Sequence, residues 1–183
     1  MRKNFGAKPF LYPMPVLILG TYDEHGVPNA MNAAWGGIAD SQEIFIALGD
    51  HKTTDNIRLT GAFTVSVADA AHMVEADYVG IVSANDVPDK FSRAGLHATK
   101  SEFVNAPIID EFPITLECRL KKFTEEGVIG EILNVSIDDR VLNEAGTVDP
   151  MKLDAISYDP INHFYLKVGE IVGNAFSDGN KLK

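Results

Sequence analysis

The sequence predicts a mainly β protein, an antiparallel barrel with small helices packed at its ends. Short strand-like runs recur along the 183-residue chain, with turn residues between them. The helical segments are fewer and shorter, which indicates connectors rather than a helical layer. No repeat, low-complexity tract or Pro/Ser linker divides the chain. Residues 1–183 are therefore expected to form a single domain.

The predicted strands of the first half are separated by clear turns. Residues 15–22 form the first strand, and residues 23–28 form a hairpin turn in which Gly26 supplies a position with φ > 0. Residues 43–48 are apolar on both faces, as in a central strand. Residues 62–67 alternate in polarity, and their inward side chains are expected to be Phe63, Val65 and Val67.

Three more strands are predicted toward the C-terminus. In residues 114–121, Ile114, Leu116, Cys118 and Leu120 share one face, opposite Thr115, Glu117, Arg119 and Lys121. In residues 129–137 the inward face is expected to hold Ile129, Leu133, Val135 and Ile137. Residues 163–168 are rich in strand formers.

Four short helical segments connect these strands. Residues 53–58 begin with a capping residue and end near Gly61. Residues 70–79 are predicted to pack on the barrel through Met73, Val74 and Tyr78. Residues 86–95 contain an N-capping Asp, an early Pro and a terminal Gly, and residues 149–153 begin in the same way.

Composition excludes several classes of function. The chain has 16 Lys plus Arg and 26 Asp plus Glu, a net charge of −10, so it repels nucleic acid and anionic membrane surfaces. No apolar run approaches the roughly 20 residues of a membrane span, and no apolar segment follows the basic N-terminus as in a signal peptide. We therefore expect a cytoplasmic protein.

Motifs for metals and nucleotides are also missing. The single cysteine, Cys118, excludes an intrachain disulfide and a Cys-based zinc site. The five histidines show no close metal-binding spacing, so no metal site is expected. Glycines never occur in the G-x-G spacing of a dinucleotide-binding turn. Because Cys118 lies on the inward face of its strand, it is expected to be a buried structural residue.

Residues 29–37 combine small residues, two amides, the only tryptophan and a glycine pair, directly after the hairpin. Such a segment lets the backbone approach a flat ligand, with the two amides, Asn29 and Asn32, hydrogen-bonding its heteroatoms and Trp35 forming a wall. The alternative is a barrel strand that uses Ala and Gly at a tight corner.

Residues 51–56 place a lysine and two hydroxyls at a predicted helix N-terminus. Free N–H groups, the helix dipole and Lys52 together would make a phosphate site. Ordinary N-capping is the alternative, and it explains Thr53 but not Lys52.

Residues 83–91 form a third candidate segment. Lys90 and Phe91 could place a cation and an aromatic ring beside a ring system, or they could belong to a solvated helix whose Phe91 docks on the core. Near the C-terminus, His163 could contact a ligand, although a lone histidine at a strand start is more often structural.

Taken in order, these segments resemble the flavin reductase-like FMN-binding split-barrel family, and its flavoredoxin branch in particular. The resemblance covers most of the chain and is weakest after Ile137. It rests on residues 11–16, 20–23, 28–37, 77–83, 89–91, 94–96, 111–113, 116–118 and 130–132.

The resemblance implies a Greek-key split barrel that binds FMN non-covalently at a homodimer interface. Family binding positions fall on Asn29, Trp35 and Lys90, with the phosphate-side segment on Thr53, Thr54 and Asn56 and an aromatic near the isoalloxazine at Phe164. Ser83 belongs to the loop in which the family carries Ser-Gly, and Ala84 replaces that glycine here, removing a φ > 0 option.

The resemblance further implies an oxidoreductase that passes hydride from NAD(P)H to flavin and then electrons to a second acceptor. The flavin carries the redox chemistry, so no catalytic acid–base residue is expected. The alternatives are an electron carrier without its own NAD(P)H activity, and a ligand-binding or structural split barrel that has lost flavin. The acidic surface is compatible with a basic redox-protein partner.

Overall fold

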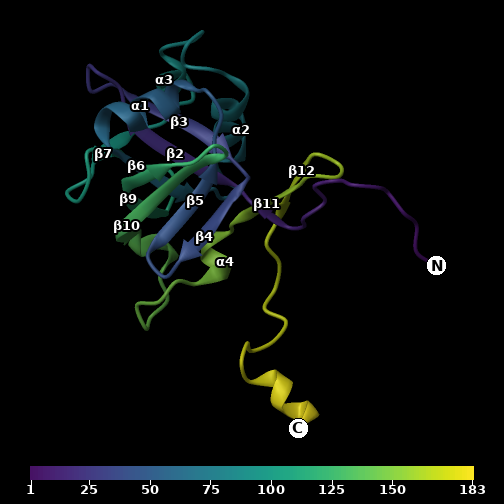
Figure 1. The fold of residues 1–183 in the computed structure, drawn as a ribbon. Coiled ribbons are helices and arrows are strands. Elements are labelled where there is room, and N and C mark those ends of the chain that lie inside the picture. The colour runs from purple at the N-terminus through teal and green to yellow at the C-terminus, as the bar shows by residue number, and fades with distance from the viewer.

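The structure, a computed structural model, describes residues 1–183 and consists mainly of antiparallel strands joined by short helices (Figure 1). Its largest sheet has seven strands in the order β3-β2-β6-β9-β10-β5-β4. These strands are β2 (Leu17–Tyr22), β3 (Pro28–Ala33), β4 (Gly36–Asp40), β5 (Glu43–Ala47), β6 (Ala62–Val67), β9 (Ile114–Phe123) and β10 (Gly127–Ile137).

The large sheet curls into a split barrel. Strands β3 and β4 occupy its two opposite edges, yet only Ala34 and Trp35 separate them along the chain. The two edges must therefore come close at that connection, which we call the seam. This architecture confirms the predicted mainly β, antiparallel split-barrel fold.

Two smaller sheets and two extended termini complete the structure. Strands β1 (Met14–Pro15), β11 (Ile156–Asp159) and β12 (Phe164–Lys167) form one small sheet, and β7 (Ala98–Lys100) and β8 (Pro107–Ile109) form the other. Residues 1–13 and 168–183 leave the barrel as extended arms, the second ending in the short helix η2 (Asp178–Leu182) (Figure 1).

The helices are α1 (Lys52–Thr60), α2 (Met73–Ile81), α3 (Lys90–Arg93), α4 (Pro150–Leu153) and the single turn η1 (Asp139–Val141). Gly61 ends α1 at φ +66°, and the Asp149 carboxylate caps α4 by accepting hydrogen bonds from two backbone N–H groups, as predicted. None of these helices has the length and apolar character needed to cross a bilayer.

Helix boundaries and packed faces depart from prediction in three places. Helix α1 begins before Thr53, so Thr53 is not its cap. The segment predicted over 86–95 is helical only in α3. Val74 is exposed, and Ala76 and Val79 are the buried residues of α2 instead. Small residues there allow α2 to lie close to β3, which the apolar pattern alone does not indicate.

Strand β2 separates two buried apolar clusters. Leu17 and Leu19 point into the barrel, where Phe63 and Val65 are fully buried, while Val16 and Ile18 point toward α2 and α3. Val67, also predicted to point inward, is only partly buried. Strand β2 is thus covered on both faces, and truncating a side chain such as Phe63 to alanine costs about 3–5 kcal/mol.

The predicted inward and outward faces of β9 and β10 are wrong at several positions. Leu133, Val135 and Ile137 are exposed, because register shifts beside Gly130 and between Ile132 and Asn134 change which side chains face the barrel. On β9 the predicted polar face is buried at two positions. Its buried residues are Thr115, which hydrogen-bonds Ser66 at 2.8 Å, and Glu117, whose carboxylate accepts from Ser101 and Asn134.

Candidate functional site

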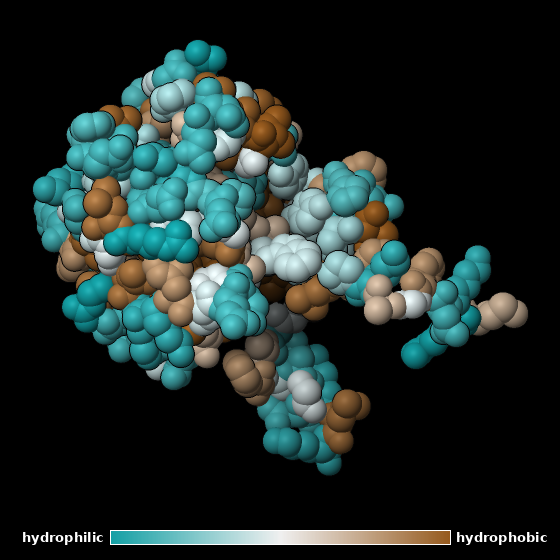
Figure 2. All heavy atoms as spheres, turned by 45° about the horizontal axis from the view of Figure 1, so that its top comes forward, coloured by the Kyte–Doolittle hydropathy of each residue, from teal (hydrophilic) through white to brown (hydrophobic).

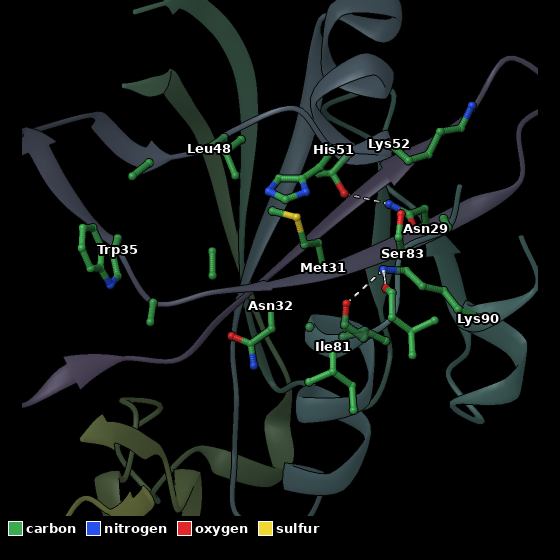
Figure 3. Close-up of a pocket in the computed structure, with 18 residues that line it drawn as sticks. Asn29, Met31, Asn32, Trp35, Leu48, His51, Lys52, Ile81, Ser83 and Lys90 are labelled. Atoms are coloured by element: carbon green, nitrogen blue, oxygen red, sulfur yellow. Dashed lines mark hydrogen bonds between the residues drawn. The ribbon is translucent and has the colours of Figure 1, made fainter. Parts of the chain in front are cut away.

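A cavity of about 390 Å³ lies at the seam, where β3, the start of α1 and the end of α2 converge (Figure 3). Six of the predicted site residues line it. They are Asn29, Trp35, Lys52, Thr53, Ser83 and Lys90. Three segments that are distant in sequence, around positions 29–35, 51–53 and 79–90, are therefore brought together in one site.

Asn29 is the most informative residue of the cavity. Its side-chain amide is buried, and Nδ2 donates to Thr53 Oγ1 at 2.9 Å and to Thr21 Oγ1 at 3.5 Å. Its Oδ1 is buried without a hydrogen-bond partner. An unpaired buried carbonyl costs about 1–3 kcal/mol, so the site is built for a ligand that supplies a hydrogen-bond donor.

The N-terminus of α1 faces the same cavity. The preceding residue, His51, lines the cavity and makes no capping hydrogen bond, so the first-turn N–H groups lack a side-chain acceptor. The Thr53 hydroxyl stands in that first turn. An uncapped helix start with a hydroxyl is an environment that favours an anionic group.

Lys52 was expected to supply positive charge for a phosphate, but it contributes little charge to the cavity. Its Nζ forms an ion pair with Glu24 Oε2 at 3.1 Å. In Figure 3 its side chain leaves the start of α1 and its ammonium group points away from the cavity. The pKa of Glu24 is lowered by backbone hydrogen bonding and by Lys52. The positive charge of Lys52 is therefore already compensated.

Lys90 is a buried cation at the opposite wall. Only 3% of the residue is exposed, and Nζ donates to the carbonyls of Val79 at 2.9 Å and Val82 at 2.8 Å. These carbonyls belong to the C-terminal end of α2, where a cation complements the helix dipole. Burial lowers the pKa of Lys90 to about 8. An ammonium has three N–H donors, so one remains for a ligand.

Trp35 lies at the seam, at the other end of the cavity from Lys90 (Figure 3). Trp35 is 54% exposed, so it is not part of the core. The Trp35 carbonyl accepts a hydrogen bond from Ala47 N–H at 2.7 Å, which fixes the backbone of the seam. Its indole also borders an apolar groove of about 520 Å³ beside residues 8–11.

Four predicted site residues do not line the cavity. Thr54 donates to the Gly49 carbonyl at 2.7 Å, and Asn56 donates to Thr21 Oγ1 at 3.0 Å, so both brace the start of α1 from behind. Phe91 belongs to the apolar cluster beneath α2. Phe164 is 59% exposed on β12.

Other wall residues were not singled out by sequence reasoning. They are chiefly Met31, Leu48, His51 and Ile81, whereas Asn32, the second amide of residues 29–37, was expected at the ligand and lines the cavity. Met31 lies two residues after Asn29 on β3, so strand alternation could have placed it on the same face. The Asn32 amide donates to the Ala76 carbonyl at 3.0 Å, which joins β3 to α2.

The structure also shows the surroundings of two further polar residues, Ser83 and Cys118. The Ser83 hydroxyl lines the cavity and accepts the Asn85 N–H at 3.2 Å. Cys118 is fully buried, as predicted, and burial, assisted by Glu117, raises the pKa of its thiol to about 12. A thiol in this state is not a nucleophile at neutral pH.

A curled antiparallel sheet whose two edge strands meet at a seam is the architecture of a split barrel. The family model described as flavin reductase like domain matches residues 10–160. The chain therefore belongs to the flavin reductase-like family.

Solved structures show the same fold over the full chain. Flavoredoxin of Desulfovibrio vulgaris (Miyazaki F) is 39% identical, with a TM-score of 0.93 over 98% of this chain and 100% of that one. Flavoredoxin from Methanosarcina acetivorans is 25% identical, with a TM-score of 0.89 over 100% of both chains. A protein of Aeropyrum pernix is 30% identical over 121 residues, 64% of this chain, and this region spans 45% of that relative.

Proposed function

We propose that the protein binds FMN non-covalently in the seam cavity and acts as a flavin-dependent oxidoreductase. The observation that carries this proposal is the buried, unpartnered Oδ1 of Asn29 beside the uncapped start of α1. FMN offers hydrogen-bond donors on its ring and ribityl chain and a dianionic phosphate. These groups match an orphaned acceptor and an anion-favouring helix terminus in one cavity.

Different wall residues would hold different parts of the cofactor. The first turn of α1, with Thr53, would hold the phosphate, and Asn29 would accept a donor from the cofactor. The third N–H of Lys90 would bind a ring or phosphate oxygen, and Trp35 would cover one end of the site. When bound, FMN supplies the redox chemistry.

The remaining predicted residues support these positions. Thr54 and Asn56 fix the start of α1, Phe91 anchors α3 under Lys90, and Ser83 shapes the loop between them. Lys52 adds a weak, screened charge at the edge of the site. Phe164 would meet the flavin only if the β11–β12 hairpin faces the same or a neighbouring site.

A homodimer is part of this proposal. The extended arms expose large apolar side chains (Figure 2), and the groove beside Trp35 is apolar as well. These side chains include Phe5, Leu11, Ile171, Val172 and Phe176. A second copy would bury these surfaces and complete the flavin site next to Trp35. Sedimentation of the FMN-bound protein at micromolar concentration tests this, and a monomer mass would contradict it.

The electron donor distinguishes two forms of the function. We favour hydride transfer from NAD(P)H, because the chain belongs to the flavin reductase-like family. A carrier reduced by another protein is the second candidate, favoured by the 39% identity to a protein named flavoredoxin. The net charge of −10 would suit a basic redox partner in the cytoplasm. Steady-state oxidation of NADH and NADPH with added FMN separates the two, since a carrier gives no turnover.

A titration of apoprotein with FMN tests the cavity assignment. Trp35 fluorescence should be quenched on binding, and it is the only tryptophan. Asn29→Ala removes the buried amide, and FMN affinity should fall about tenfold. Asn85→Ala, an exposed amide that does not line the cavity, is the matched control and should bind like wild type. Equal affinity of both variants would contradict the assignment.

A further inference from the structure

A second cavity of about 380 Å³ opens next to the seam cavity, between α2 and the β11–β12 hairpin. Its own walls are Asp77, Tyr158, His163 and Tyr165. It shares four residues with the seam cavity, namely Asn32, Ala34, Gly80 and Ile81. A ligand in the second cavity would therefore touch the same wall as a ligand in the first.

Hydrogen bonds hold the aromatic walls in place. Tyr165 Oη donates to Asp77 Oδ1 at 2.8 Å and accepts from Asn32 Nδ2 at 3.5 Å. Tyr158 Oη is bonded to His163 Nδ1 at 2.7 Å, and the two tyrosine rings lie 6.1 Å apart. Burial, with the Asp77 carboxylate, raises the pKa of Tyr165 to about 12. Tyr165 thus stays a neutral hydrogen-bonding wall at physiological pH.

The backbone at the hairpin turn is held in a rare conformation. His163 adopts φ +61°, in the left-handed region that a β-carbon disfavours. This conformation places the His163 ring where it reaches Tyr158.

The second cavity contains the carboxylate of Asp77 without a lysine or arginine to balance its charge. Asp77 takes part in none of the ten ion pairs of the structure, and no Lys or Arg lines the cavity. Its Oδ2 and the Oδ1 of Asn32 accept no hydrogen bond from the protein. A carboxylate and an amide oxygen in a cavity that two tyrosines also line attract a positively charged group and repel an anion.

We propose that this second cavity is a binding subsite for a flat organic cation, held by the Asp77 carboxylate and the rings of Tyr158 and Tyr165. The subsite itself does not depend on FMN. Only its position beside the flavin rests on the proposed function. Two sources offer this chemistry, a small aromatic cation of the pyridinium type and the guanidinium of an arginine side chain from a protein partner.

Ligand-observed NMR titrations of the flavin-free protein test the subsite. The probes are 1-methylpyridinium and ethylguanidinium, with toluene as the neutral shape control and benzoate as the anionic one. At least one cation should bind more tightly than both controls. Tighter binding of 1-methylpyridinium assigns the site to small aromatic cations, and tighter binding of ethylguanidinium assigns it to an arginine side chain.

Asp77→Asn removes the charge but keeps an oxygen that accepts from Tyr165, so the wall should stay in place. Cation affinity should fall about tenfold, as for the loss of a charge-assisted contact. Glu75→Gln removes the same charge from the same helix outside the cavity and should leave affinity unchanged. If Asp77→Asn does not fold, Tyr158→Leu removes an aromatic wall and should weaken cation binding instead.

Cations that bind no better than toluene and benzoate would overturn the proposal, and so would equal affinity of the Asp77→Asn and Glu75→Gln variants. Because these titrations contain no FMN, their failure is separate from a failure of flavin binding. Repeating them with FMN bound should shift the flavin absorption as the cation enters. An unchanged flavin spectrum would contradict the position of the subsite beside the flavin.

Discussion

Replacing Lys90 with methionine removes the buried ammonium while keeping an unbranched apolar side chain in its place. The ammonium donates to two carbonyls at the end of α2, at 2.9 and 2.8 Å. Hydrogen bonds of a charged donor contribute about 1.5–3 kcal/mol each, or about 3–6 kcal/mol together. Burial of the charge opposes this, because the pKa falls from 10.5 to about 8, equivalent to about 3 kcal/mol.

The net expectation for Lys90→Met is a loss of up to about 3 kcal/mol in unfolding free energy. For a chain of this size, that lowers the melting temperature by up to about 10 °C. FMN affinity should fall about tenfold or more, since the third N–H of the ammonium is lost as well. Lys100→Met, on the exposed strand β7, is the matched control and should change neither quantity.

The pH dependence gives an independent check on Lys90. Between pH 8 and 10.5 the folded protein has released the Lys90 proton while the unfolded chain still holds it. Stability contributed by this residue therefore rises with pH across that window. The difference in unfolding free energy between wild type and Lys90→Met should widen by up to about 3 kcal/mol. This reasoning would be refuted if Lys90→Met left the melting temperature and FMN affinity unaltered. It would also be refuted if the difference in unfolding free energy between wild type and Lys90→Met narrowed as the pH rises.

Three other predictions concern single side chains. Lys52→Met should change FMN affinity less than threefold, because Glu24 already neutralises Lys52; a titration showing a loss of an order of magnitude would contradict this. Trp35→Phe should weaken FMN binding or shift the flavin spectrum with little change in melting temperature, because Trp35 is exposed; earlier melting with unchanged flavin binding would remove it from the site. Cys118 should resist alkylation by iodoacetamide at pH 8 in the folded protein, because burial raises its pKa to about 12; mass spectrometry showing rapid labelling would contradict this.

The strands and turns were largely predictable because their signals are local. The hairpin at Gly26, the end of α1 at Gly61 and the cap of α4 at Asp149 follow from residue chemistry that acts within a few positions. The faces of β10 were not predictable in this way. A register shift depends on the partner strand, so alternation placed Leu133 and Val135 on the wrong side.

The site was predictable by segment rather than by atom. Sequence reasoning selected Asn29, Thr53 and Lys90, which the fold brings to one cavity. It did not reveal that Lys90 binds the end of α2 or that Lys52 turns to Glu24, because both partners come from distant parts of the chain. Among the residues that line only the second cavity, sequence reasoning named His163 alone as a possible ligand contact, because Asp77 and Tyr165 meet only in the folded protein.

The visible absorption spectrum of the purified protein, recorded after FMN is added and excess is removed, tests the central claim most directly. Bound flavin absorbs near about 450 nm, whereas the polypeptide does not. We expect a flavin band in wild type at close to one FMN per chain. The double variant Asn29→Ala, Lys90→Met should show a much smaller band under conditions in which both proteins are folded. A wild-type protein that retains no flavin, or a double variant that retains it equally well, would contradict the account.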